Sequence, residues 1–253
     1  MGIYIGIPAR YGSTRFPGKP LKKILGLSML EHCYKRASMV KNIDKVFVAS
    51  GDDKISAFCK EKEIEFIPTD PSIERPGLRV QKAAERLNLN DEDIVVVWQG
   101  DEPLIHPDMV FDSIQPLINN PNDIFVSNMM AVASEEDRNN PSEIKVVIDS
   151  QNIALFMSRA PIPSKFHEEE GTTSYKQVCV MPFRWKFMKF FNYGLKSAKL
   201  EKQESIEMLR AIENNYKVAM VNSIFITKSV DTQKDLDDAI ELMLNDKVKE
   251  HYL

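Results

Sequence analysis

The sequence has few cysteines, no long apolar run and little net charge. Its three cysteines, Cys33, Cys59 and Cys179, are far apart and form no CxxC pair, so neither a disulfide framework nor a thiolate metal site is indicated. No apolar run approaches the roughly 20 residues of a membrane span. The N-terminal residues lack the basic head and the apolar stretch of a signal peptide. We therefore expect a protein of the reducing cytoplasm with no membrane partner.

Charges of the two signs are nearly balanced. The 253 residues carry 33 basic and 37 acidic side chains, a formal net charge of −4. Such a balance gives no global attraction to nucleic acid or to an anionic membrane. We expect no nucleic-acid partner, and any anion that the protein binds must be held by a local group of basic residues.

Short apolar runs rich in β-branched residues alternate with longer amphipathic stretches in the first half of the chain. The predicted strands are Ile3–Ile7, Lys45–Ala49, Ile64–Ile67 and Ile94–Trp98. Three helices are predicted in the same half. The first begins with a capping box at Ser28–Glu31 and runs to about Ser38, and the other two are Lys54–Lys62 and Leu78–Leu87. This alternation favours an α/β fold with a mostly parallel sheet.

Residues 123–184 instead read as consecutive strands, which predicts an antiparallel section. These strands are Ile124–Val132, Ile144–Ile148, Ala154–Arg159 and Gln177–Arg184. A helix, a strand and a last helix follow over Glu204–Asn214, Val218–Val221 and Asp235–Leu244. Without repeats or low-complexity linkers, residues 1–253 are predicted to form one domain, with 123–184 as a candidate dimer platform. We interpret the aromatic residues at its end as core or interface residues: Phe183, Trp185, Phe187, Phe190 and Phe191.

A basic loop with two glycines follows the first predicted strand. Between Pro8 and Leu21 the loop interleaves these glycines with three basic residues: Gly12, Gly18, Arg10, Arg15 and Lys19. Glycines let backbone amides approach phosphate oxygens, while arginine and lysine neutralise the charge on a departing pyrophosphate. The carboxyl end of a strand is also where open α/β sheets bind ligands. The spacing matches neither Walker A nor GxGxxG, so we interpret the loop as a different triphosphate cradle, with a plain basic surface loop as the alternative.

Two acidic residues are candidates for a metal site. Asp101 follows the strand Ile94–Trp98 in the segment Gln99–Pro103, at the same sheet edge as the loop, where a carboxylate can hold Mg²⁺ against phosphate oxygens. Asp231 precedes the last predicted helix and is either a second metal ligand or a plain helix N-cap. Two carboxylates near one basic loop form the arrangement that metal-assisted phosphoryl transfer needs.

These motifs resemble those of the CMP-KDO synthetases, the 3-deoxy-manno-octulosonate cytidylyltransferases. Ile7–Leu21 and Gln99–Pro103 occur in the order of that family. The first motif fits the CMP-KDO synthetases better than the sialic-acid CMP transferases at three places: Tyr11, Thr14–Arg15 and Gly18–Pro20. The similarity continues along nearly the whole chain, through Lys145–Asp149, Phe156–Pro163, Leu200–Arg210 and Val230–Thr232.

The resemblance implies a fold, a reaction and site residues. The fold is the Rossmann-like three-layer sandwich of nucleotide-diphospho-sugar transferases with an antiparallel insertion, usually as a homodimer. The reaction transfers CMP from CTP to the anomeric hydroxyl of a keto-deoxy sugar acid, with Mg²⁺ as cofactor, for bacterial surface glycan synthesis. The implied nucleotide-binding residues are Pro8, Ala9, Arg10, Gly12, Ser13, Arg15 and Lys19, and the implied catalytic residues are Asp101, Lys19 and Arg15. The implied sugar-side residues are Gln99, Arg159, Glu204 and Glu207, and the implied metal ligands are Asp101 and Asp231.

The sequence departs from the family pattern on the sugar side. The family motif His-x-Ser-Gly-Thr-acid-Arg is replaced by Asp70–Arg79, which keeps at best its arginine, as Arg79. The family motif Gly-Ile-Tyr-x-Tyr is replaced by Val178–Phe183, and the usual glutamine of the late helix is replaced by Met208. A site that loses hydroxyl and amide partners discriminates differently. We expect a modified octulosonate as the acceptor. The alternatives are drift within a tolerant pocket, another ulosonic (nonulosonic) acid, a sugar 1-phosphate, and a regulatory relative that binds nucleotide without turnover.

Overall fold

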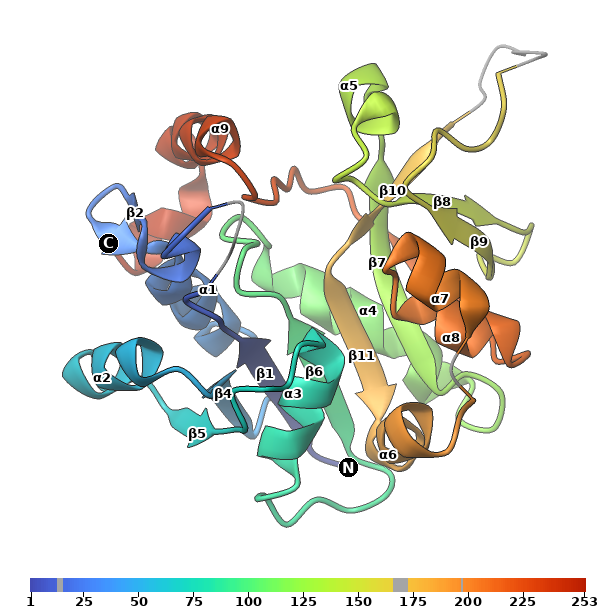
Figure 1. The fold of residues 1–253 in the computed structure, drawn as a ribbon, viewed down its shortest axis with the longest axis horizontal. Helices are drawn as coiled ribbons and strands as arrows, with labels where there is room; N and C mark the ends of the chain where they lie inside the picture. The colour runs from blue at the N-terminus through green and yellow to red at the C-terminus, as the bar shows by residue number, and fades with distance from the viewer. Residues whose placement is uncertain (13–15, 166–172, 197) are drawn as a thin grey trace.

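The computed structural model describes residues 1–12, 16–165, 173–196 and 198–253. Within these residues, ten strands form one sheet in the order β5-β4-β1-β6-β11-β7-β10-β8-β9, with β12 also paired to β7. Helices cover both faces of this sheet (Figure 1). A small hairpin of β2 (Lys23–Ile24) and β3 (Leu27–Ser28) forms a separate sheet.

One half of the main sheet is parallel. Its strands are β5 (Phe66–Pro68), β4 (Lys45–Ser50), β1 (Ile3–Pro8) and β6 (Ile94–Trp98). The helices between them are α1 (Met29–Ser38), α2 (Asp53–Glu61) and α3 (Pro76–Ala84). These elements overlap the strands and helices predicted for the first half of the chain, which confirms the α/β alternation.

The side chains of β6 divide between two apolar layers. Ile94, Val96 and Trp98 belong to one buried cluster, and Val95 and Val97 belong to the other. Successive side chains of a strand point to opposite faces of the sheet, so a strand buried on both faces is apolar throughout. The result is the three-layer sandwich that the resemblance implied.

The other half of the sheet is mixed. Its strands are β11 (Val180–Arg184), β7 (Val126–Val132), β10 (Tyr175–Val178), β8 (Lys145–Ile148), β9 (Ala154–Ser158) and β12 (Val218–Asn222). These strands pair in antiparallel fashion except for β12, which is parallel to β7. β11 pairs directly with β6, so the antiparallel strands extend the central sheet.

The single strand predicted over Gln177–Arg184 is wrong, because the structure divides it at Cys179 into β10 and β11. β10 lies between β7 and β8, whereas β11 pairs with β6 and β7. The backbone N–H of Gln99 donates a hydrogen bond to the carbonyl oxygen of Cys179 (3.2 Å). The chain therefore changes its pairing partners at the point where Cys179 meets the loop after β6.

The single helix predicted over Glu204–Asn214 is also wrong. α7 (Lys199–Glu204) ends at Ser205, whose backbone is left-handed (φ 56°), and α8 (Met208–Glu213) begins after a short turn. Left-handed backbone does not continue a right-handed helix, so the apolar periodicity belongs to two helices. The break places Ser205 and Glu207 at the wall of a cavity.

Three helices, α4 (Pro107–Asn119), α5 (Glu135–Asn139) and α6 (Trp185–Tyr193), have no counterpart among the predicted elements. On α6, Phe187 and Phe191 are buried in the apolar layer beneath the sheet, whereas Phe190 is 43% exposed. Phe183 and Trp185 are buried in the same layer, so the interpretation of these aromatic residues as core is confirmed for all of them except Phe190.

The predicted start of α1 is confirmed as a capping box. The Ser28 hydroxyl accepts a hydrogen bond from the backbone N–H of Glu31 (3.1 Å), and the Glu31 carboxylate accepts one from the backbone N–H of Ser28 (2.7 Å). The remaining elements are α9 (Gln233–Leu244) and the 3-10 helices η1 (Lys19–Leu21) and η2 (Lys247–His251). None of the helices in the described part of the chain has both the length and the apolar composition that crossing a bilayer requires.

Candidate active site

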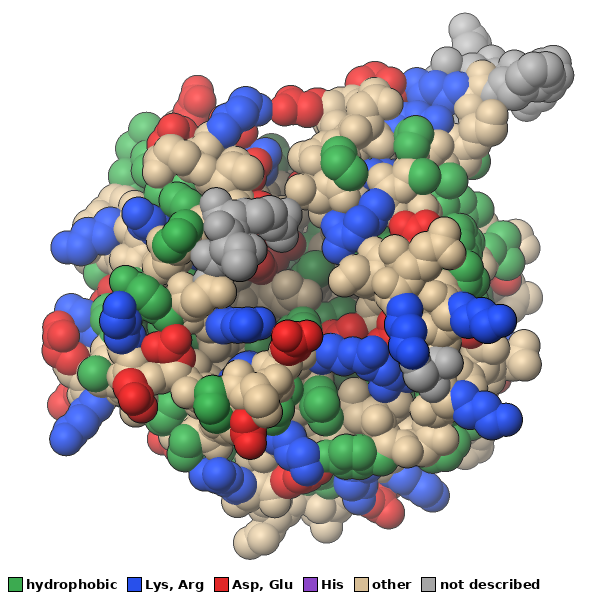
Figure 2. All heavy atoms as spheres, viewed as in Figure 1, with side chains coloured by type: hydrophobic (Ala, Val, Ile, Leu, Met, Phe, Trp, Pro, Cys, Tyr) green, Lys and Arg blue, Asp and Glu red, His purple; other side chains and the backbone are tan. Residues whose placement is uncertain are grey.

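The loops after β1 and β6 meet at the carboxyl edge of the parallel strands. β1 and β6 are neighbours. After β6, Gly100 lies so close to the end of β1 that a Cβ at this position would be 2.9 Å from the carbonyl oxygen of Pro8. The surface is hollowed near the centre of this face (Figure 2). Two cavities of the described structure open there and share Gln99 and Asp101 in their walls. The Asp101 carboxylate therefore stands at their junction.

The first cavity, of about 390 Å³, lies along the loop after β1, and we call it the loop-side cavity. Its lining includes five of the predicted nucleotide-binding residues: Pro8, Ala9, Arg10, Gly12 and Lys19. The predicted residues Ser13 and Arg15 lie outside the described residues. Basic side chains and glycine-bearing backbone converge on this cavity, which is the composition that phosphate groups require.

Lys19 is held by two carboxylates at the junction of the cavities. Its Nζ lies 2.7 Å from Asp101 Oδ2 and 2.9 Å from Asp231 Oδ1. Burial acts to lower the pKa of Lys19, but the two carboxylates outweigh burial and raise the pKa above the usual lysine value. Lys19 follows Gly18, whose φ of 70° is a conformation that glycine adopts readily. A charged ammonium is thus fixed between the two acidic residues.

Asp231 is not the N-cap of α9. Thr232 occupies that position and forms a capping box with Asp235, so the helix-cap interpretation of Asp231 is wrong. The backbone N–H of Val230 donates a hydrogen bond to the carbonyl oxygen of Asp101 (3.0 Å). This bond ties the two acidic loops together and brings both carboxylates to the same point.

The two aspartates are suitable in chemistry and placement for a magnesium ion. Both already converge on one positive group, the Lys19 ammonium. In the described part of the chain, no group of three or more His, Cys, Asp or Glu side chains could hold a metal. Magnesium commonly takes one or two protein carboxylates and completes its coordination with water and substrate phosphates. The pair therefore fits an ion that binds together with a nucleotide.

The second cavity, of about 380 Å³, extends from Asp101 to the turn before α8, and we call it the α8-side cavity. Of the predicted sugar-side residues, it is lined by Gln99, Arg159 and Glu207. Glu204 lies behind Arg159 and outside the cavity lining: its carboxylate accepts hydrogen bonds from the Ser158 hydroxyl (2.8 Å) and from the backbone N–H of Arg159 (2.9 Å). The structure thus places Glu204 as a support for the end of β9.

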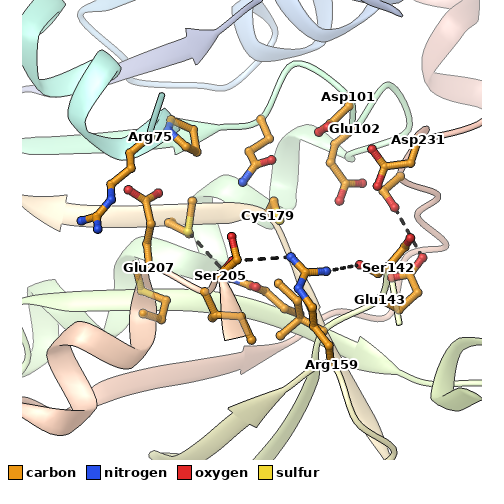
Figure 3. Close-up of a pocket in the computed structure, with 18 of the residues that line it drawn as sticks. Arg75, Asp101, Glu102, Ser142, Glu143, Arg159, Cys179, Ser205, Glu207 and Asp231 are labelled. Carbon is orange, nitrogen blue, oxygen red and sulfur yellow. Dashed lines mark hydrogen bonds between the residues drawn. The ribbon is translucent and has the colours of Figure 1, made fainter. Parts of the chain in front are cut away.

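Backbone carbonyls hold the Arg159 guanidinium at the cavity wall (Figure 3). Its Nε donates to the carbonyl oxygen of Glu204 (2.8 Å), and its Nη1 donates to those of Pro141 (3.0 Å) and Ser142 (3.2 Å). Carbonyl oxygens orient a guanidinium without neutralising its charge. Arg159 is therefore a fixed positive group that suits a carboxylate ligand.

Four glutamates that line the α8-side cavity have raised pKa values, with burial as the largest cause for each: Glu102, Glu143, Glu201 and Glu207. Burial raises the pKa of Glu102 to about 8, and the neighbouring Asp101 and Glu143 add to this effect. Burial also raises the pKa of Glu207 to about 7. Glu102 was not among the predicted site residues, although its position next to Asp101 in the motif Gln99–Pro103 was a signal that could have found it.

The segment that departs from the family pattern contributes residues to both cavities. The Arg79 guanidinium donates to the Thr69 hydroxyl (2.7 Å) and to the carbonyl oxygen of Ile73, and it lines the loop-side cavity. Arg75, which sequence reasoning missed, lines the α8-side cavity and pairs with Glu201 (2.7 Å). The segment that departs from the family pattern therefore lies in the walls of both cavities.

The chain is similar to known proteins along most of its length. Residues 4–224 match the cytidylyltransferase family. A 3-deoxy-manno-octulosonate cytidylyltransferase of Thermodesulfovibrio yellowstonii is 37% identical, over 92% of this chain and 94% of its own. An 8-amino-3,8-dideoxy-manno-octulosonate cytidylyltransferase of Shewanella baltica is 34% identical, over 93% of this chain and 96% of its own.

The fold is also that of a solved enzyme. A structure of CMP:2-keto-3-deoxy-manno-octonic acid synthetase complexed with CTP superposes with a TM-score of 0.87 at 30% identity, over 96% of this chain and 99% of that chain. The resemblance that Ile7–Leu21 and Gln99–Pro103 indicated is thus confirmed. The chain belongs to the cytidylyltransferase family.

Proposed function

We propose that the protein transfers CMP from CTP to the anomeric hydroxyl of a 3-deoxy-manno-octulosonate-type sugar acid. The observation that carries this proposal is the junction at Asp101, where the loop-side cavity with Lys19 meets the α8-side cavity with Arg159. The first cavity suits a triphosphate and the second a small acid. Relatives named as cytidylyltransferases of 3-deoxy-manno-octulosonate and of its 8-amino form support this class of acceptor.

The reaction forms one bond and breaks one. The anomeric oxygen of the acceptor attacks the α-phosphorus of CTP, the bond from the α-phosphorus to the bridging oxygen breaks, and pyrophosphate leaves with the bonding electrons. The hydroxyl proton passes to solvent. Because the acceptor supplies the nucleophile, the protein contributes positioning and charge neutralisation. Arg10 and Lys19 would neutralise the phosphates, and Arg159 would bind the acceptor carboxylate.

We propose Mg²⁺ as the cofactor, with Asp101 and Asp231 as its protein ligands. Bound there, the ion would neutralise phosphate charge and lower the pKa of the acceptor hydroxyl. The convergence of both carboxylates on one cation supports this proposal. When CTP is bound, we propose that the Lys19 ammonium contacts phosphate oxygens.

We also propose that the protein acts as a homodimer in the cytoplasm and supplies a CMP-activated sugar for surface glycan synthesis. Apolar side chains are exposed beside the ends of β7 and β12: Val132 (59%), Ile224 (88%) and Ile226 (73%). A second copy would cover such a patch. Sedimentation velocity tests this proposal: a species of twice the chain mass is expected, and a monomer at micromolar concentration would contradict it.

Pyrophosphate release tests the proposed reaction. CTP and Mg²⁺ would be supplied with 3-deoxy-manno-octulosonate, its 8-amino form, a nonulosonate or a sugar 1-phosphate. We expect release with an octulosonate and none with the sugar 1-phosphate. Release with a nonulosonate alone, or with the sugar 1-phosphate alone, would refute the proposed acceptor class. Measurable CTP binding without release in any mixture would instead support the regulatory alternative.

A further inference from the structure

The α8-side cavity has an unpartnered carboxylate oxygen on the side away from Asp231 (Figure 3). Among the described residues, buried oxygens of Glu102 and Glu207 lack a hydrogen-bond partner. Glu102 adjoins Asp101, which lies at the junction of the two cavities, whereas Glu207 lies across the α8-side cavity beside Arg75. A buried polar atom without a partner is destabilising, so Glu207 Oε1 would favour a ligand that donates to it.

The surroundings of Glu207 are built around its carboxylate. The backbone N–H of Gly77 donates to Glu207 Oε2 (3.2 Å), and a Cβ at position 77 would lie 3.2 Å from both carboxylate oxygens. Gly77 belongs to the segment that departs from the family pattern. Met208, which stands where the family has glutamine, is buried and has no hydrogen-bond donor in its side chain. One carboxylate oxygen is therefore supported by the protein, and the other is left to a ligand.

Several other acidic residues of this cavity have a basic partner. Asp101 and Asp231 contact Lys19, and Glu201 pairs with Arg75 (2.7 Å) and with Arg210 (2.7 Å). Glu143 lies 3.6 Å from the ammonium of Lys176. In the part of the chain that the structure describes, Glu207 forms no ion pair. A positively charged group of the ligand could form an ion pair with the Glu207 carboxylate.

We infer that the acceptor carries a primary amine at the end remote from its carboxylate, and that Glu207 binds this ammonium group. The inference rests on the proposed function. In an octulosonate the carboxylate and the reacting hydroxyl are attached to the same carbon, the anomeric C2, so both lie near Asp101 when the hydroxyl reacts. The far end of the molecule then extends across the cavity to Glu207.

An ammonium group suits this position better than a hydroxyl group. An ammonium donates up to three hydrogen bonds and brings a positive charge to the carboxylate, whereas a hydroxyl donates one hydrogen bond and brings no charge. Glu207 is therefore a specificity residue: it discriminates between an amino-substituted octulosonate and the plain octulosonate.

The test is the ratio of kcat/KM for 8-amino-3,8-dideoxy-manno-octulosonate to kcat/KM for 3-deoxy-manno-octulosonate, measured by pyrophosphate release at saturating CTP and Mg²⁺. We expect the wild-type ratio to exceed about 10, and Glu207→Gln to lower kcat/KM for the amino acceptor by on the order of 10- to 100-fold. The amide still bonds a hydroxyl, so the plain acceptor should change less than about threefold. Glu213→Gln, an exposed position on the same helix, is the matched control.

A second variant guards against misfolding of the first. Gly77→Ala places a methyl group against the carboxylate and should also lower the ratio, while circular dichroism and CTP binding stay as in the wild type. A wild-type ratio near 1, or an equal loss on both acceptors in Glu207→Gln, would overturn the inference and leave the proposed function standing. Absence of turnover with either octulosonate would instead refute the proposed function itself.

Discussion

Lys19 lies between Asp101 and Asp231, with its Nζ 2.7 Å from one carboxylate and 2.9 Å from the other. The same two carboxylates are the proposed ligands of Mg²⁺. In the free protein the lysine ammonium and a metal ion would therefore compete for the same oxygen atoms. We infer that Lys19 weakens metal binding until a nucleotide offers it phosphate oxygens.

Replacing Lys19 by methionine should tighten Mg²⁺ binding to the free protein and still impair catalysis. Removal of one positive charge between two carboxylates should raise the Mg²⁺ affinity about tenfold. Loss of the phosphate contact should lower kcat/KM by on the order of 10²- to 10³-fold. Titration calorimetry with Mg²⁺ and pyrophosphate release measure the two effects, with Lys23→Met, an exposed position in β2, as the control. An unchanged Mg²⁺ affinity would refute the competition.

Asp101→Asn and Asp231→Asn should each abolish most of the turnover without unfolding the protein. Each variant keeps the shape of the side chain but removes a negative charge that the metal requires, so we expect kcat to fall by on the order of 10²- to 10³-fold. Asp123→Asn is the control, because its pairing with Lys217 is exposed and such pairs contribute about 0–1 kcal/mol. Either variant with a nearly wild-type rate would remove that aspartate from the proposed metal site.

Arg159→Lys should weaken binding of the acceptor and spare binding of CTP. A lysine cannot reproduce the fork of donors that the carbonyls of Glu204, Pro141 and Ser142 orient. We expect KM for the acceptor to rise by about 10- to 100-fold, the loss of one charge-assisted contact, and KM for CTP to stay within about twofold. Steady-state kinetics with each substrate varied in turn measure both constants. A rise in KM for CTP alone would place Arg159 in the nucleotide site.

Glu207 should make the stability of the free protein fall as the pH rises. Its pKa is raised to about 7 by burial, against about 4.3 for an unperturbed glutamate. Between these values the folded chain holds a proton that the unfolded chain releases, so the contribution of Glu207 is present below about pH 4.3 and is lost as the pH approaches about 7. Urea unfolding should show that Glu207→Gln gains stability relative to the wild type across this window. A constant difference between variant and wild type would contradict the shift.

Sequence reasoning found the elements and residues whose signals are local. The β-branched run of β6 predicts a doubly buried strand, and the capping box at Ser28 predicts the start of α1; the structure has both. Asp101 and Lys19 were also predicted to lie at one sheet edge, because parallel strands deliver their carboxyl ends to the same place. Their 2.7 Å contact agrees with that prediction.

Features that depend on tertiary structure were not accessible from the sequence. The break between α7 and α8 follows from the left-handed backbone of Ser205, and apolar periodicity alone does not show it. The contacts of Arg75 with Glu201 and of Gly77 with Glu207 join segments more than a hundred residues apart. Only the fold brings these residues to one cavity wall.

Direct detection of the product tests the central claim. Phosphorus-31 NMR would follow the protein with CTP, Mg²⁺ and either 3-deoxy-manno-octulosonate or its 8-amino form. We predict equal amounts of pyrophosphate and of a new phosphodiester that joins CMP to the sugar acid, with neither signal in the Asp101→Asn variant. Hydrolysis of CTP without the phosphodiester, or a diphosphate-linked product in its place, would contradict the proposal that this protein transfers CMP to a keto-deoxy sugar acid.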